Sequence, residues 1–230
     1  MSADLINYLA GFVNRQRLAK FEKVLYYRTR YINLVCEDIY QGHNASALIR
    51  TCDCFGIQDF HIIEKKNSFE INDEVALGAS NWLNIYRHNT PGEDFHKVFG
   101  SLKARGYRIV ATTPHRNGVG LTEFDLDNGP VSLVFGTEKE GLSEEIIEYA
   151  DEYVSIDMFG FTQSFNVSVS AGIILHHLRM KLNNSRIDWH LNDDEKMAIK
   201  LDWLRNSIKR SDLIEKKFIY RKNQGNAPGP

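Results

Sequence analysis

The chain has 230 residues, of which 43% are hydrophobic and 25% are charged, and its formal net charge is -2. This length and apolar content suffice for a buried core and exclude an intrinsically disordered chain. No apolar run approaches the ~20 residues of a membrane-spanning helix, so we expect no membrane partner. The first 14 residues lack the pattern of a secretion signal, and only three cysteines are present. Both features predict a reduced, cytoplasmic protein.

The charges are unevenly distributed along the chain. Residues 1–31 carry a balance of +4 and residues 196–222 carry +6, whereas residues 32–195 carry -12. Two basic ends suit a polyanion such as RNA, because Lys and Arg neutralise its phosphates. The alternative is that both ends are ordinary solvated helix faces.

Helical and strand patterns alternate along the chain. Residues 1–31 are predicted to be helical, and short apolar runs then alternate with helical patterns. The later elements are expected as strands at 32–36, 60–63, 107–112, 131–135 and 153–156, with helices at 44–55, 94–105, after Ser143, 166–182 and after Asn192. This order predicts an α/β fold with a mostly parallel sheet and helices on both faces.

Capping residues and apolar stripes locate several of these helices. Asn44 and Ser143 are expected as helix caps, and Asn192 with Glu195 has the spacing of a capping box. The last helix is expected to bury one stripe, formed by Met197, Leu201, Leu204 and Ile208.

The same patterns divide the chain into segments. We expect an N-terminal helical extension at 1–31, a central α/β domain at 32–183, a C-terminal helical extension at 184–222 and a disordered tail at 223–230.

One glycine-rich segment resembles a phosphate-binding loop but lacks its cation. Residues 136–143 read Gly-Thr-Glu-Lys-Glu-Gly-Leu-Ser, with Leu142 where a phosphate-binding loop has its lysine. The two carboxylates of the segment would also repel phosphate. This argues against a nucleotide hydrolase, which stays the weakest alternative, and no G-x-G-x-x-G follows a strand to indicate a dinucleotide site.

The start of the helix expected at 166–182 is built from poor helix formers. Val167, Val169 and Gly172 lie there among serines. Such small residues allow a ligand or backbone to approach closely, or a tight helix crossing. His176 and His177 directly follow each other in this helix, so their side chains diverge. No residue cluster has the spacing of metal ligands, and we expect no metal.

Three segments together carry a family resemblance. They are Asn-Ala-Ser-Ala-Leu-Ile-Arg-Thr at 44–51, Leu-Val-Phe-Gly-Thr-Glu-Lys-Glu-Gly-Leu-Ser at 133–143, and Ile-Asp-Met at 156–158 running into Gln-Ser-Phe-Asn-Val-Ser-Val-Ser-Ala at 163–171. In this order they resemble the three motifs of the SpoU/TrmH group of SPOUT RNA ribose 2′-O-methyltransferases. The basic ends and the G-x-E-K-x-G form of the second motif look most like the branch that methylates guanosine in tRNA.

The resemblance implies a fold, a cofactor and partners. It implies a SPOUT-type domain with a C-terminal trefoil knot, a homodimer, and a tRNA substrate. It also implies that S-adenosyl-L-methionine binds in the knot loops. By match to the motifs, the cofactor-binding residues are Gly136, Thr137, Glu138, Gly141, Ile156, Met158, Gly160, Ser164 and Phe165.

The resemblance further implies a catalytic set of Arg50, Glu138 and Asn166, supported by Asn44 and Ser164. Arg50 suits a role in holding a phosphate and favouring a developing alkoxide, because a guanidinium stays protonated. Glu138 is expected to accept a proton or orient Arg50, and Asn166 to position the ribose or shape its loop. The alternatives are a surface ion pair, an exposed loop acid and a helix cap, respectively.

The expected RNA contacts are the basic residues Arg15, Arg17, Lys20, Arg179, Lys181, Lys209 and Arg210. Two positions depart from the family pattern, since Asp157 stands where proline is common and Phe165 where leucine is usual. The alternatives left open are an rRNA 2′-O-methyltransferase and a non-catalytic RNA-binding or assembly factor with the same fold.

Overall fold

The computed structural model describes residues 2–39, 42–89, 95–114, 118–137 and 140–224. The chain divides into two compact units, Thr29–Trp189 and a second unit formed by Met1–Arg28 with His190–Pro230. Most of the tail expected at 223–230 lies outside the described residues. Within the described ranges, no helix combines the length and apolar character that a membrane crossing requires.

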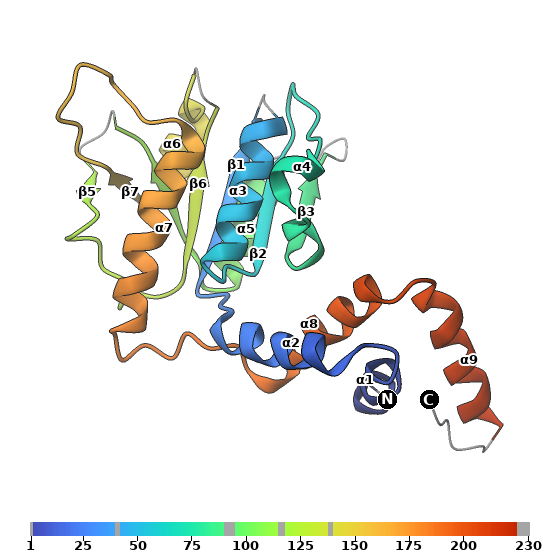
Figure 1. The fold of residues 1–230 in the computed structure, drawn as a ribbon. Helices are drawn as coiled ribbons and strands as arrows, with labels where there is room; N and C mark the ends of the chain where they lie inside the picture. The colour runs from blue at the N-terminus through green and yellow to red at the C-terminus, as the bar shows by residue number, and fades with distance from the viewer. Residues whose placement is uncertain (1, 40–41, 90–94, 115–117, 138–139, 225–230) are drawn as a thin grey trace. The chain divides into compact units, whose positions relative to one another are not determined.

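A seven-stranded sheet forms the centre of the unit Thr29–Trp189 (Figure 1). Its strands lie in the order β3-β2-β1-β6-β4-β7-β5, and every pair between neighbours is parallel. The strand bounds are β1 Ile32–Glu37, β2 Asp59–Ile63, β3 Asn84–His88, β4 Arg108–Thr112, β5 Val119–Gly120, β6 Val131–Phe135 and β7 Glu152–Ser155. The prediction of an α/β fold with a mostly parallel sheet is confirmed.

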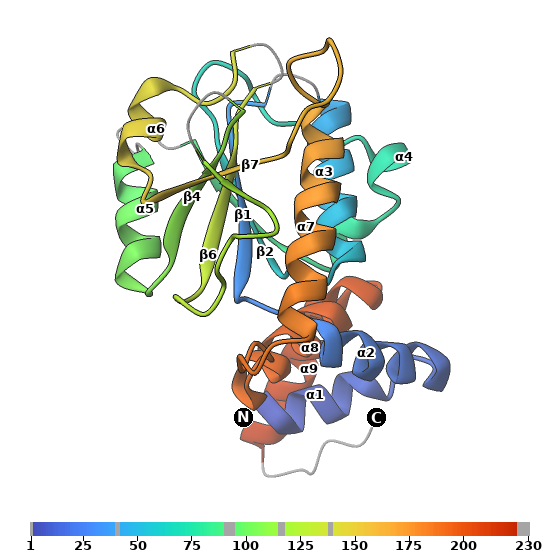
Figure 2. The same ribbon diagram turned by 90° about the vertical axis from the view of Figure 1, so that its left-hand side faces the viewer.

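Helices cover both faces of this sheet, as Figure 2 shows. Helices α3 (Gly42–Cys54) and α7 (Val167–Asn183) pack on one face, around a core that includes Leu34 and Leu133. Helices α5 (Phe95–Ala104) and α6 (Glu144–Tyr149) pack on the other face. Because both faces are covered, every residue of β1, β2 and β6 is buried.

The structure corrects some of the sequence expectations in this unit. Asn44 lies inside α3 and is buried, so its prediction as a helix cap is wrong, because the helix begins two residues earlier at Gly42. Ser143 does precede α6, but its side chain makes no capping hydrogen bond. The edge strands β3 and β5, the helix α4 (Asp73–Ala76) and the 3-10 helix η1 (Ala79–Asn81) were not expected.

The described residues of the second unit form four helices, and we call it the helical unit. They are α1 (Ser2–Ala10), α2 (Arg15–Tyr27), α8 (Asp193–Ser207) and α9 (Ser211–Asn223). Aromatic pairs join them, with ring centroids 5.4 Å apart for Phe21 and Trp203 and 5.0 Å apart for Tyr8 and Phe218. Such pairs contribute about 0.5–1.5 kcal/mol beyond the area they bury.

Helix α8 confirms one local prediction and corrects another. Asn192 and Glu195 form the predicted capping box at its start. The buried residues of the helix are Ile199, Trp203 and Leu204, whereas Met197 and Leu201 are only partly buried. The predicted apolar stripe is therefore rotated, because the large indole of Trp203 occupies the core.

Candidate active site

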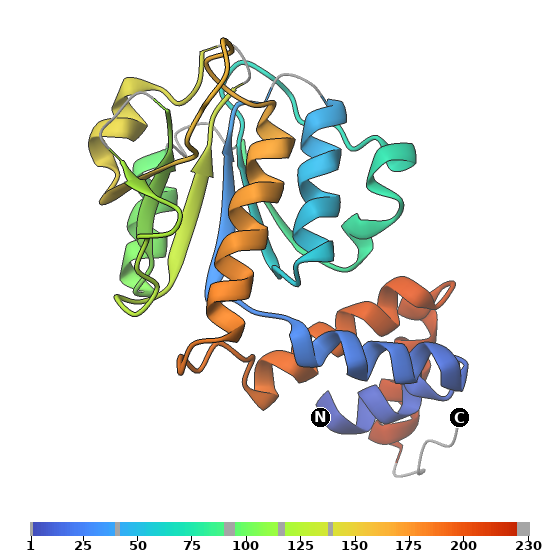
Figure 3. The same cartoon turned by 60° about the vertical axis from the view of Figure 1, so that its left-hand side comes forward.

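Two cavities lie side by side where β4, β6 and β7 end. Their volumes are about 230 Å³ and about 60 Å³. Ligands of parallel sheets bind at these carboxyl ends, because the loops there diverge. Figure 3 shows the turn after β6 and the segment between β7 and α7 at this same end of the sheet. The residues that line both cavities are Thr112, Thr113, Pro114, Ser164, Phe165 and Ser170.

The turn after β6 forms one wall of the larger cavity. Gly136, Thr137 and Gly141 line it, as the cofactor prediction requires. Thr137 donates its backbone N–H to the Gly141 carbonyl at 2.9 Å, and Gly141 donates in return at 3.1 Å. A Cβ on Gly136 would lie 2.2 Å from the carbonyl carbon and oxygen of Gly141, so this close approach requires glycine. Glu138 lies outside the described residues.

The segment between β7 and α7 forms another wall. Ser164 and Phe165 line both cavities, and Ile156 and Met158 line the smaller one. Gly160 is exposed and is not among the described residues that line either cavity. Apart from Glu138 and Gly160, every residue predicted to bind the cofactor therefore lines a cavity.

Two predicted catalytic asparagines meet at the start of α7. Asn166 donates a hydrogen bond from Nδ2 to Oδ1 of Asn44 at 3.2 Å, although 122 residues separate them in the chain. The Oδ1 of Asn166 accepts the backbone N–H of Ser168 at 2.9 Å and its hydroxyl at 2.6 Å. Asn166 thus caps α7 and also joins the first motif to the third.

Arg50 stands on the same helix as Asn44. Its side chain is exposed, and it is not among the described residues that line the two cavities. Because Glu138 is outside the described residues, the expected proximity of these two side chains stays a prediction.

Several lining residues were missed from the sequence. Thr112 ends β4, Thr113 and Pro114 follow it, and Leu142 lies in the second motif but was not among the predicted binding residues. Only the sheet topology could have indicated the residues at the end of β4. Because β4 is parallel to β6 and pairs with it, the residues that follow both strands lie at the same edge of the sheet. The residue types themselves carry no chemical signature.

The lining fits S-adenosyl-L-methionine. Leu142, Ile156 and Phe165 offer apolar surface to an adenine ring, while the hydroxyls of Thr113 and Ser164 offer hydrogen bonds. Over the described ranges, no three His, Cys, Asp or Glu side chains come together as a metal ion would need.

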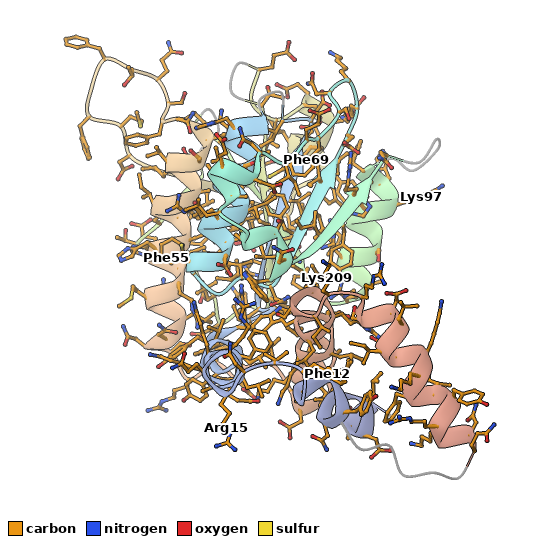
Figure 4. All side chains as sticks on the ribbon, turned by 45° about the vertical axis from the view of Figure 1, so that its right-hand side comes forward. Phe12, Arg15, Phe55, Phe69, Lys97 and Lys209 are labelled. Carbon is orange, nitrogen blue, oxygen red and sulfur yellow. The ribbon has the colours of Figure 1, made fainter. Side chains whose placement is uncertain are left out.

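The basic residues predicted to contact RNA fall into two groups. Arg15, Arg17, Lys20, Lys209 and Arg210 are exposed on the helical unit, and Figure 4 shows the Arg15 side chain pointing away from α2.

Two of the predicted RNA contacts on α7 have packing partners instead. The Arg179 guanidinium lies 3.9 Å from the ring centroid of Trp189, and burial lowers its pKa to about 10. Lys181 donates from Nζ to the carbonyls of Phe124 at 2.5 Å and Thr122 at 3.3 Å. These partners favour a structural role for both side chains within the unit Thr29–Trp189, and contact of either one with RNA stays a prediction.

Comparison with known proteins places this geometry in a family. The chain is 41% identical over 210 residues to a tRNA (guanosine(18)-2′-O)-methyltransferase of Borreliella burgdorferi, covering 91% of this chain and 94% of that protein. It is 33% identical over 191 residues to the enzyme of that name from Thermus thermophilus, covering 82% and 96%.

A solved structure and a family match agree with these relatives. The crystal structure of the A. aeolicus TrmH/SpoU tRNA modifying enzyme superposes with a TM-score of 0.74 at 30% identity, covering 85% of this chain and 98% of that one. Residues 31–176, which contain all three motifs, match the SpoU rRNA methylase family. The chain is a member of the SpoU/TrmH methylase family.

Proposed function

We propose that this protein transfers a methyl group from S-adenosyl-L-methionine to the ribose 2′-hydroxyl of a guanosine in tRNA. The observation that carries the proposal is the 41% identity to a tRNA (guanosine(18)-2′-O)-methyltransferase over 94% of that protein's length. Position 18 of tRNA is therefore the first nucleotide to test.

The cofactor is assigned to the two cavities beside β4, β6 and β7. When bound, S-adenosyl-L-methionine supplies an electrophilic methyl group. Leu142 and Phe165 contribute apolar surface, and Thr137 and Gly141 hold the turn that forms one wall. A turn fixed in this way would hold the bound cofactor in one orientation relative to the ribose, and such alignment lowers the barrier through proximity.

The catalytic roles are assigned to side chains from all three motifs. Asn44 and Asn166 hold each other and the start of α7, so they would position the ribose beside the cavity. Arg50 would bind the adjacent phosphate and favour negative charge on the 2′-oxygen. Ser164 would contribute a hydrogen bond from the shared wall, and Glu138 would accept a proton or orient Arg50.

The tRNA partner is assigned to the helical unit. Arg15, Arg17 and Lys20 lie on α2, and Lys209 and Arg210 lie just before α9, all with exposed side chains. Exposed cations neutralise phosphates without needing a fixed geometry.

A second copy of the chain and a knotted path complete the proposal. Val169 is 47% exposed and Met180 is 48% exposed on α7, and these two apolar side chains support an interface there with a second copy of the chain. Strand β7 lies between β4 and β5, although both of these strands precede it in the chain, and α7 follows it. The insertion of a later strand between two earlier ones supports the trefoil knot. Sedimentation should give a dimer, and Met180→Glu should give a monomer.

The experiment that tests the function is incubation of the protein with labelled S-adenosyl-L-methionine and either bulk tRNA or bulk rRNA, followed by mapping of the methylated ribose. We expect label on a guanosine 2′-oxygen in tRNA. Label on rRNA alone would identify an rRNA methyltransferase, and binding of RNA without any transfer would indicate a non-catalytic factor.

A further inference from the structure

A buried carboxylate lies beneath the turn that forms the cavity wall. Glu37 ends β1 and is only 3% exposed. Its Oε2 accepts the backbone N–H of Ser143 at 2.8 Å, and its Oε1 accepts a hydrogen bond from Nζ of Lys65 at 2.7 Å. One side chain therefore links the end of β1, the loop after β2 and the residue that ends the turn.

Ser143 is the place where this link reaches the cavity. It directly follows Gly141 and Leu142, which line the cavity, and it precedes α6. Glu37 is the group that accepts the Ser143 backbone N–H, one residue before the start of α6. The other end of the turn is held by Gly136, which continues from β6.

Lys65 is itself held in place. Its Nζ lies 3.4 Å from the Ser143 hydroxyl and 5.4 Å from the ring centroid of Phe95. The Asp38 carboxylate accepts the backbone N–H groups of Lys65, Lys66 and Asn67, each at 2.8 Å. Asp38 adopts a left-handed backbone conformation with φ of 49°, which is costly for a non-glycine residue. These bonds fix the loop that carries the Lys65 ammonium.

We propose that Glu37, with Lys65 as its counter-ion, is a positioning residue for the turn after β6, which forms a wall of the cofactor cavity. Glu37 is not among the described residues that line the cavity, so it acts through Ser143. Glu37 fixes the positions of Gly141 and Leu142 in the cavity wall. It thereby determines the affinity of the site for S-adenosyl-L-methionine. This inference rests on the proposed function, since it assigns the cavity to that cofactor.

The test compares three single variants of the full chain. Glu37→Ala removes both hydrogen bonds. Glu37→Gln keeps one oxygen that can accept the Ser143 N–H but removes the charge that pairs with Lys65. Glu145→Gln is the matched control, because Glu145 also approaches Lys65, at 3.7 Å, but its side chain is 72% exposed. S-adenosyl-L-methionine binding is measured by calorimetry well below the unfolding temperature of each variant.

We expect Glu37→Ala to raise the Kd for S-adenosyl-L-methionine about tenfold, the scale of one lost charge-assisted hydrogen bond. Glu37→Gln should recover part of this loss, and Glu145→Gln should match wild type. In steady-state kinetics the KM for the cofactor should rise, while kcat at saturating cofactor and the KM for tRNA stay near wild type. A residue that serves only stability would lower the unfolding temperature without this split.

Each outcome bears on one claim. If Glu37→Ala and Glu37→Gln fold and bind the cofactor as tightly as wild type does, the positioning role is overturned. If Glu37→Ala does not fold, Glu37→Gln alone decides, and an unchanged Kd again overturns the role. If wild type itself does not bind S-adenosyl-L-methionine, the proposed function fails first.

Discussion

The carboxyl edge of the sheet and the helical unit use polar residues in different ways. At the sheet edge, side chains such as Glu37, Asn44 and Asn166 have fixed partners at hydrogen-bond distance. On the helical unit, Arg15, Arg17 and Lys20 are exposed along one helix.

This difference follows from what each region is proposed to bind. Methyl transfer needs two reacting centres held in one geometry, and loss of that geometry lowers the rate steeply. Attraction to a polyanion depends on the number of charges and is weakened by salt. Substitutions at the sheet edge should therefore alter chemistry or cofactor affinity, whereas substitutions on the helical unit should alter tRNA affinity.

The largest effect is expected for Arg50→Ala. We expect methyl transfer at saturating substrates to fall by about 10² to 10³, the scale of losing one group that stabilises transition-state charge. The Kd for S-adenosyl-L-methionine should stay near wild type, because Arg50 is not among the described residues of the cavity lining. Single-turnover transfer and calorimetry measure the two quantities. Full activity in this variant would remove Arg50 from the mechanism.

Gly136→Ala should come next. Its Cβ would collide with the Gly141 backbone, so the turn must shift and the Kd for S-adenosyl-L-methionine should rise by about tenfold or more. Gly100→Ala is the matched control, because a Cβ on Gly100 in α5 meets nothing within 4 Å. The control should bind the cofactor normally and gain up to about 1 kcal/mol of stability. Equal cofactor affinity in both variants would contradict the assignment of the turn after β6 as a wall of the cofactor site.

A smaller, salt-dependent effect is expected for the triple variant Arg15→Ala, Arg17→Ala and Lys20→Ala. Its tRNA affinity should fall, and the slope of log affinity against log salt should decrease by about one for each lost phosphate contact. Cofactor affinity should not change. Lys103→Ala, which removes a cation paired with Asp151 at 2.7 Å, serves as the control in filter binding over a salt series. A salt slope equal to that of wild type would place the tRNA elsewhere.

The smallest effect is expected for Asn192→Ala. Loss of the capping box at α8 should lower the free energy of unfolding by about 1 kcal/mol, as measured in urea, without changing cofactor affinity. Asn192→Asp keeps a side-chain acceptor and should retain most of that stability. A change in cofactor affinity would contradict the separate roles that we propose for the two units.

The predictability of each element followed from its environment. β1 and β6 were predicted because strands covered on both faces are mostly apolar, as in Val131–Phe135, where Ser132 is the one polar residue. β3 was missed because an edge strand keeps exposed polar residues, and Tyr86 and Arg87 interrupt its apolar pattern. The start of α3 was misplaced because Asn44, a common cap residue, is instead buried and paired with Asn166.

The amino-acid order alone determined the alternation of strands and helices, the three motifs and the uneven charge, since these depend on near neighbours in the chain. Only the tertiary structure decided which distant residues meet. It brought Asn166 to Asn44, placed Thr112 and Thr113 in the cavity wall, and buried Glu37 under Ser143. The physical reason is that parallel strands far apart in the chain end at one edge of the sheet. The local sequence pattern of each strand does not specify which residues become its neighbours there.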